Sequence, residues 1–364
     1  MQVGELKRKI KENASIVVVY CIFLLVAINY FVTYISEIYI ITYLIRVIIV
    51  ICICVSMLLR KRIIIDVQTS ILIVGLSITS ILSSELDGVV FLILASVLIK
   101  NLDTGGVIIP ISVIYFLMTG VLLIGLCLGI YTNSVDNAKN AMGVSAQLCG
   151  FNNANVAGAF FYAVLISIFL VSKNELKALA AVNIMNGVVF YLVRSRAPFL
   201  ALIVTSLVFG LCIWNKNFSK LVAYSVVTFS FWAGFLSPLI YDRFQELNRF
   251  SSGRLGAYAE IMSNWQWSTL LFGGKPKEVE SFFISFVGIH GLFLLLFLYI
   301  LVIRRIQLLY KAELYKEIAF LTGFLLFGAF ENVQGCFESL VSWVFWYCLL
   351  YAGTGGSKSI FARS

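Results

Sequence analysis

IVVVYCIFLLVAINYFVTYIS, the stretch that occupies residues 16–36, carries no charged side chain over its whole length. A helix of about 20 apolar residues crosses the hydrocarbon core of a bilayer, so this stretch predicts a transmembrane helix. The segment before it holds Lys7, Arg8, Lys9 and Lys11, as a secretory signal peptide would. The apolar run is too long for a signal-peptide core, however, and it lacks a small-residue cleavage site, which favours a retained span.

The whole chain has the composition of that stretch. Of its 364 residues, 61% are hydrophobic and 12% are charged, and the mean hydropathy is +0.98. Soluble domains are roughly 45–50% apolar and about 25% charged. These values exclude a soluble globular domain and predict an all-α polytopic membrane protein, with a single membrane domain over residues 1–364.

Apolar stretches recur along the chain and predict about 12 transmembrane helices. They lie at residues 16–36, 38–59, 63–84, 88–100, 107–130, 154–172, 178–193, 199–214, 221–240, 281–303, 318–335 and 338–354. The fourth is short and the third is diluted by Asp66 and Gln68, so the helix count over residues 63–100 stays open. Two longer loops are predicted, at residues 131–153 and 241–280.

Lys and Arg near helix ends indicate orientation, because cytoplasmic loops carry their excess. With a cytoplasmic N-terminus, 18 of the 27 basic residues fall on the cytoplasmic side and 8 on the outer side, while Arg46 lies inside the second span. We therefore expect both termini in the cytoplasm and both long loops outside. The net charge of +9 follows from this asymmetry and indicates no nucleic-acid partner.

The sequence offers little for metal or disulfide chemistry. Its one histidine, His290, has apolar neighbours, and none of its 8 cysteines belongs to a Cys-x-x-Cys pair. We interpret His290 as a packed, neutral side chain and the cysteines as small buried hydrophobes. No metal site and no cofactor is predicted.

The segment Arg194-Ser195-Arg196-Ala197-Pro198 lies at the predicted outer end of the seventh span. Pro198 suits the first turn of the eighth helix, whose N-terminal N–H groups would face the outer side. Two arginines beside such a helix end favour an anion site suited to phosphate. The alternative is that Arg194 and Arg196 extend to lipid headgroups.

The loop over residues 241–280 combines arginines with an amphipathic stretch. Arg243, Arg249 and Arg254 are candidates for bidentate phosphate binding, and the five acids of the loop offer them salt bridges as the alternative. From Arg254 onward, apolar side chains recur on one helical face and two tryptophans follow. This pattern predicts a short helix in the membrane interface that ends before Phe272-Gly273-Gly274.

Two further polar elements open helices on the predicted outer face. Asn153 and Asn155 enter the sixth span, where asparagine either caps the helix or hydrogen-bonds sugar hydroxyls. Glu280 opens the tenth span, where its carboxylate either complements the helix dipole or acts as a general base.

Taken in order, these elements resemble the bacterial O-antigen and capsule polysaccharide polymerases (Wzy-type), a family related to the O-antigen ligases. The matching elements are Asn153-Ala154-Asn155, Ser195-Arg196, Ser252-Gly253-Arg254, Phe272-Gly273-Gly274, Glu280-Ser281 and Gly288-Ile289-His290-Gly291. The resemblance covers roughly residues 151–305. Ala154 replaces the usual proline of the family, and Glu280 stands where ligases carry histidine, which favours a polymerase.

The resemblance implies a metal-independent glycosyltransferase of the bacterial plasma membrane. It would transfer a growing glycan from undecaprenyl pyrophosphate onto the sugar end of the next lipid-linked repeat unit. Arg196 and Arg254 would stabilise the departing pyrophosphate, and Glu280 would deprotonate the acceptor. Further substrate contacts would come from Arg194, Arg243, Arg249, Asn153 and Asn155. Membrane lipids, a chain-length regulator and the flippase of the same pathway are the expected partners.

Three other functions stay open. They are a flippase or transporter of lipid-linked oligosaccharides, an O-antigen ligase-type transferase, and a non-catalytic subunit of an envelope assembly. A flippase should keep its cations in a central cavity, whereas only Arg46 is clearly intramembrane here. Inverted repeats, which many transporters contain, are not visible.

We predict that Asn137 and Ser251 are extracytoplasmic and that Lys61, Lys220 and Lys311 are cytoplasmic, because the asymmetry of basic residues requires it. Single cysteines at these positions, on a cysteine-free background, would be labelled with an impermeant maleimide in intact cells. Labelling of position 251 only after lysis would contradict the predicted topology.

Overall fold

The computed structural model describes residues 3–36, 38–58, 63, 65–83, 88–100, 107–137, 145–241, 243, 245–250, 253–274 and 279–353. Regular structure within these ranges is helical, apart from one isolated β-bridge between Val135 and Gln147. Eight helical segments are long and apolar enough to cross a membrane, and three shorter apolar helices accompany them. The all-α class is confirmed for these residues, and the long apolar helices support a multi-pass membrane protein.

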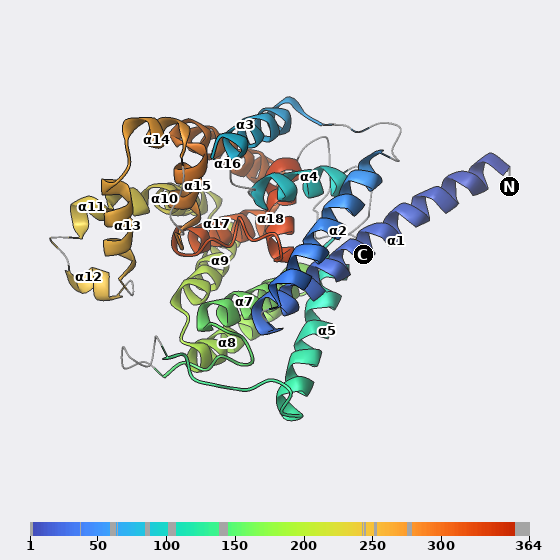
Figure 1. Cartoon of the computed structure of the whole chain (residues 1–364), viewed down its shortest axis with the longest axis horizontal. Helices are drawn as coiled ribbons and strands as arrows, with labels where there is room; N and C mark the ends of the chain where they lie inside the picture. Colours follow the sequence, from blue (N-terminus) through green and yellow to red (C-terminus); the bar gives the residue numbers. More distant parts are fainter. Residues whose placement is uncertain are drawn as a thin grey trace.

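Figure 1 shows the helices of the bundle coloured in chain order, from α1 in blue to α18 in red. The first third contains α1 (Val3–Phe31), a π-helical continuation η1 (Val32–Ser36), α2 (Tyr39–Leu58), α3 (Val67–Ser83), α4 (Gly88–Lys100) and α5 (Ile108–Cys127). The middle contains α7 (Ala154–Val171), α8 (Glu175–Val193), α9 (Arg196–Trp214), α10 (Lys216–Trp232), η2 (Ala233–Leu236) and α11 (Ser237–Ile240). The last third contains α12 (Gln245–Phe250), α13 (Arg254–Ser263), α14 (Trp267–Phe272), α15 (Phe282–His290), α16 (Leu292–Lys311), α17 (Tyr315–Phe330) and α18 (Leu340–Tyr351).

Helices α17 and α18 form the centre of the bundle (Figure 1). Nearly every side chain of both is buried, with α17 packed against α9 and α10, and α18 against α4. A helix that is apolar on all sides must be enclosed by other helices or by lipid. By contrast, α2 buries only one stripe, formed by Thr42, Ile45, Ile49 and Ile53. Its remaining apolar surface suits contact with acyl chains.

The cysteines follow the same division between core and surface. All eight are free thiols, and only Cys212 and Cys348 are buried. Cys21, Cys54 and Cys127 are exposed on apolar helices, where hydrocarbon rather than protein would surround them. The prediction of buried cysteines is therefore correct for two of the eight, because a lipid-facing helix surface is as apolar as a core.

The loop predicted at residues 241–280 contains three helices, α12, α13 and α14. The single amphipathic helix expected from Arg254 is divided in two, since α13 ends at Ser263 and α14 begins at Trp267. Trp267 and Phe272 are largely exposed. Exposed aromatic side chains suit a membrane interface, and the placement of α13 and α14 there stays a prediction.

The predicted span at residues 281–303 is also divided. Helix α15 ends at His290 and α16 begins at Leu292, with Gly291 between them at φ 82° and ψ 165°. His290 is buried, as predicted, and its Nδ1 lies 2.6 Å from the hydroxyl oxygen of Thr79 on α3. Apolar residues continue on both sides of Gly288-Ile289-His290-Gly291, so hydropathy averaged over a whole span gave no sign of the interruption.

Two glycines allow the backbone to pack closely at this interruption. Gly273, at φ 91°, lies against the carbonyl of Ile289, and Gly291 lies against the carbonyl of Leu271. A Cβ atom at either glycine would overlap the facing backbone. Both also have a positive φ that side-chain-bearing residues rarely adopt. The turn after α14 is thereby fixed against the junction of α15 and α16.

We predict that Gly273→Ala and Gly291→Ala each destabilise the protein by more than about 1–3 kcal/mol, the usual cost of holding a residue in a sparsely populated backbone region, because the overlap of the Cβ atom adds to it. Gly187→Ala is the matched control, because Gly187 is helical and a Cβ there meets open space. Thermal unfolding in detergent would compare the three. Equal melting temperatures for Gly273→Ala, Gly291→Ala and the control would contradict the close packing.

Candidate functional site

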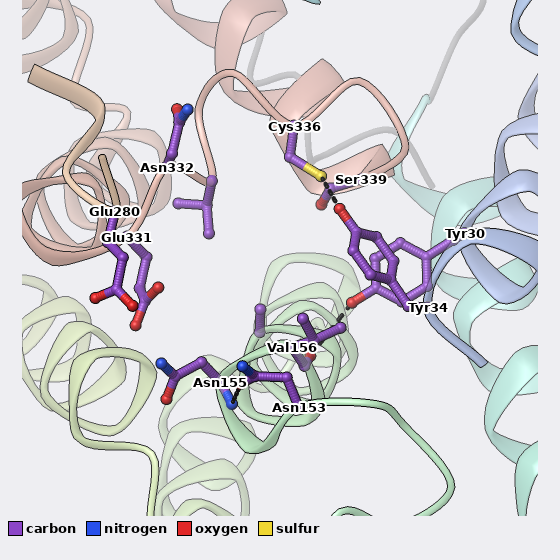
Figure 2. A pocket seen from close by; sticks show the side chains of 12 residues that line it. Tyr30, Tyr34, Asn153, Asn155, Val156, Glu280, Glu331, Asn332, Cys336 and Ser339 are labelled. Carbon is purple, nitrogen blue, oxygen red and sulfur yellow. Dashed lines mark hydrogen bonds between the residues drawn. The ribbon is translucent and has the colours of Figure 1, made fainter. Parts of the chain in front are cut away.

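A cavity of about 220 Å³ lies among the ends of α1, α7, α15 and α17 (Figure 2). It is lined by Tyr30, Tyr34, Asn153, Asn155, Val156, Ala159, Glu280, Glu331, Asn332, Val333, Cys336 and Ser339. The predicted topology places all of these residues at or near outer helix ends. Segments spread over some 300 residues of sequence therefore converge where the sequence predicts an outer face.

The two predicted asparagines line the cavity from α7. Asn153 is the N-cap of α7, and its side chain accepts a hydrogen bond from the backbone N–H of Asn155 at 2.6 Å. The side-chain oxygen of Asn155 accepts from the hydroxyl of Ser195 at 3.4 Å. Asp136 accepts from the backbone N–H of Ala154 at 3.2 Å, which fixes the preceding loop to the same helix end. Asn153 therefore both caps α7 and lines the cavity.

Arg254, the first residue of α13, is held between two carboxylates. Its Nε donates to Glu280 and its Nη2 donates to Glu331. The side chains of Arg254 and Glu331 are 15% and 14% exposed, and that of Glu280 is 53% exposed. Burial lowers the pKa of Arg254, but the two carboxylates outweigh it and hold this pKa above its ordinary value. The guanidinium therefore stays charged. Arg254 forms the salt bridges that the sequence offered as the alternative to phosphate binding.

Glu331 is the site residue that the sequence reasoning missed. It fell inside the predicted span at residues 318–335, whereas α17 ends at Phe330 and a loop follows. This loop, residues 331–339, supplies five of the lining residues. One signal was available, because Glu331 is the only charged residue of that predicted span, and an acid within a span favours a functional position.

The loop at residues 331–339 is firmly held. The indole N–H groups of Trp343 and Trp346 donate to its backbone carbonyls at 2.8 and 2.9 Å. The hydroxyl of Ser342 donates to the carbonyl of Val333 at 2.5 Å, and the buried side chain of Gln334 donates back to Phe324 in α17. A loop anchored by so many side-chain hydrogen bonds presents Glu331 in a fixed position.

The wall of the cavity opposite the glutamates is aromatic (Figure 2). The ring centroids of Tyr30 and Tyr34 lie 4.8 Å apart. The hydroxyl of Tyr30 donates to the carbonyl of Val156 at 3.3 Å, and that of Tyr34 lies 3.7 Å from the sulfur of Cys336. Tyr34 belongs to the π-helical segment η1, a distortion that is frequent at functional sites.

Of the predicted arginines whose side chains are described, none lines the cavity, and Arg254 adjoins it through Glu280 and Glu331. Arg196 begins α9 and is exposed, and Arg243 is exposed after α11. Arg194 ends α8 at φ 54°, with its guanidinium 4.9 Å from the ring centre of Tyr191. That contact with an exposed aromatic ring fits the headgroup alternative for Arg194. The side chain of Arg249 lies outside the described part of the structure.

Comparison with protein-family models, with curated proteins and with solved structures found no match to this chain. Within the described residues, no group of three or more His, Cys, Asp or Glu side chains is arranged to hold a metal ion. The motifs behind the polymerase resemblance do meet in space. Asn153 and Asn155 share a cavity with Glu280, Glu280 pairs with Arg254, and the two glycine motifs pack against each other.

We predict that Glu331→Gln lowers stability more than Glu280→Gln. Glu331 is mostly buried, and a hydrogen bond to a charged group contributes about 1.5–3 kcal/mol. Glu280 is more than half exposed, so solvent screening limits the stabilisation from its ion pair with Arg254 to less than about 1 kcal/mol. Thermal unfolding of both variants would measure the difference. A larger loss for Glu280→Gln would show that Glu331 is not the main anchor of Arg254.

Proposed function

We propose that the protein is a membrane glycosyltransferase that polymerises oligosaccharides linked to undecaprenyl pyrophosphate. The observation that supports this best is a cavity beside membrane helices whose two lining carboxylates, Glu280 and Glu331, both pair with Arg254. Arginine binds pyrophosphate in bidentate fashion. Carboxylates in pairs serve anomeric chemistry in glycoside hydrolases, and the asparagines and tyrosines of the cavity offer hydrogen bonds and ring faces to sugars.

The proposed reaction is a displacement at the anomeric carbon of the donor. The acceptor hydroxyl oxygen forms a bond to this carbon while the bond from the carbon to the pyrophosphate oxygen breaks. The electron pair leaves with undecaprenyl pyrophosphate, and the hydroxyl proton passes to a carboxylate. Arg254 stabilises the negative charge that grows on the leaving group.

The ion pairs of Arg254 suggest an order of events. A carboxylate whose oxygens are held by a guanidinium is not free to accept the proton of the acceptor hydroxyl. A pyrophosphate that binds Arg254 competes with the two glutamates and releases one of them. Glu280, as the more exposed of the two, is the proposed base. Glu331, held by the rigid loop, keeps Arg254 in position.

Arg196 is proposed as a second contact to the donor pyrophosphate. It directly follows Ser195, which hydrogen-bonds to Asn155 in the cavity wall. Arg194, Arg243 and Arg249 would bind substrate at the periphery. The proposal places the cavity on the outer face of the bacterial plasma membrane, in a chain of about 12 spans with both termini in the cytoplasm. The chain-length regulator and the flippase of the pathway are the proposed partners.

We predict that Arg196→Lys and Arg254→Lys each lower polymerisation at least roughly tenfold, with alanine worse, since removing one preorganised donor typically costs about 100- to 1000-fold. Glu280→Gln should abolish turnover while donor binding persists. Lys216→Gln is the control, because it alters an exposed ion pair with Glu313 on the predicted cytoplasmic side. Purified protein and a lipid-linked repeat unit, with chain length resolved on gels, provide the assay.

Normal turnover in Glu280→Gln would show that the base is wrongly assigned. Parental rates in both Arg196→Ala and Arg254→Ala would place the pyrophosphate site elsewhere. Deletion cells separate the polymerase from a flippase. A polymerase defect leaves single lipid-linked repeats on the outer face of the membrane, whereas a flippase defect leaves them on the inner face.

A further inference from the structure

A second charged pair adjoins the cavity, and the proposed reaction does not use it. Arg46 lies within α2, a predicted span, and its Nη2 lies 2.5 Å from the carboxylate of Glu338. Glu338 is 6% exposed, while the side chain of Arg46 is 38% exposed. Charged groups at membrane depth are costly and are usually retained for function.

Short contacts connect this pair to the cavity. Glu338 belongs to the loop at residues 331–339, and its Oε2 lies 3.6 Å from the sulfur of Cys336. Cys336 lines the cavity and contacts the hydroxyl of Tyr34 on its other side. A series of polar side chains therefore runs from the cavity wall to Arg46 on α2.

The pair with Glu338 uses only part of the Arg46 guanidinium. Its Nε is buried and has no hydrogen-bond partner among the described residues, although arginine carries five N–H donors. The guanidinium lies 5.6 Å from the ring centre of Tyr43. Tyr43 and Val47 flank it and are largely exposed, on a surface that lipid would cover. Arg46 thus has an unpartnered Nε, and the rest of its side chain is partly exposed on the lipid-facing surface.

A second buried polar group lies at the same level. The hydroxyls of Thr33 and Thr42 lie 3.3 Å apart across the hairpin of α1 and α2. Asn29 on α1 and Arg46 on α2 each lie about one helical turn from this threonine contact, on the side away from the connection between the two helices. Asn29 is fully buried, and neither its side-chain nitrogen nor its oxygen has a partner within the described residues. Because buried amides are normally hydrogen-bonded, Asn29 is a second polar group near Arg46 whose hydrogen bonds no described residue supplies.

We propose that Arg46 binds the phosphate group of a polyprenyl phosphate lipid that enters from the bilayer beside α2. The planar guanidinium matches phosphate, and the depth of Arg46 in a lipid-facing helix favours a phosphate carried on a long apolar chain. Glu338 holds the guanidinium until the phosphate replaces it. The identity of the lipid rests on the proposed function. The lipid chain would lie along α2, with the sugars in the cavity.

Undecaprenyl phosphate is the probe, with undecaprenol and inorganic pyrophosphate as matched ligands that lack the charge or the chain. Binding to the purified full-length protein in detergent would be measured by native mass spectrometry. We expect undecaprenyl phosphate to bind at least tenfold more tightly than either. Arg46→Gln should weaken this binding at least tenfold, whereas Glu338→Gln should preserve or strengthen it by freeing the guanidinium. Lys216→Gln, whose cation is also 38% exposed in an ion pair, should leave the affinity unchanged.

Parental affinity in Arg46→Gln would overturn the proposal. So would an equal loss in Glu338→Gln, because the pair would then serve only to hold α2 against the loop. Equal binding of inorganic pyrophosphate would overturn the lipid assignment. The double variant Arg46→Gln/Glu338→Gln keeps a neutral hydrogen-bonded pair, so we expect it to stay folded, which thermal unfolding would check. It should nevertheless bind the lipid only weakly. Parental affinity in this folded variant would also overturn the proposal.

The outcomes separate this site from the proposed function. If the protein binds undecaprenyl phosphate through Arg46 but never extends a lipid-linked repeat unit, the polymerase proposal fails and the lipid site stands. If it polymerises while Arg46→Gln binds the lipid with parental affinity, only the lipid site fails.

Discussion

The clamp of two glutamates on Arg254 is the interaction on which the rest of the site depends. It joins the start of α13, the segment two residues before α15 and the residue after α17, which are separate in sequence. Arg254 is mostly buried, so the loss of both acids would leave a buried charge unpaired, which is far more costly than the loss of a surface pair. With two acids around one arginine, the cluster carries a net negative charge. In the proposed reaction, an anionic donor would displace a carboxylate from Arg254, and its binding would thereby be coupled to the release of a base.

The position of Glu280 in this clamp follows from backbone packing nearby. Gly273 and Gly291 bring the turn after α14 against the junction of α15 and α16, and Glu280 lies on the segment between them. Because interiors are close-packed and respond discretely to added volume, a single methyl group at either glycine would push the turn after α14 away from the end of α15, and Glu280 belongs to the segment that connects the two. The charged site thus depends on two residues that carry no charge and touch no ligand.

Some of this arrangement could be predicted from the sequence. Apolar stretches located the helices because a bilayer demands continuous apolar length, and motif order brought Asn153, Glu280 and Arg254 into one hypothesis. The division at Gly291 could not be predicted, since apolar residues continue on both sides and only the backbone conformation reveals it. Glu331 was assigned to a span because the apolar run before it keeps the mean hydropathy high beyond the residue at which α17 ends. Its pairing with Arg254 joins residues that are far apart in the sequence, and no local sequence pattern predicts such a contact.

The loop at residues 331–339 carries two glutamates that pair with arginines, Glu331 with Arg254 and Glu338 with Arg46. Buried ion pairs contribute little net stability compared with well-packed apolar residues, so stability alone gives no reason to place two of them on one short loop. The tryptophan hydrogen bonds that fix this loop also fix the spacing of the two pairs. One arginine comes from the predicted outer loop and the other from a predicted span. An amphipathic ligand whose charged group joins a sugar to a lipid chain is the kind of molecule that would meet both arginines.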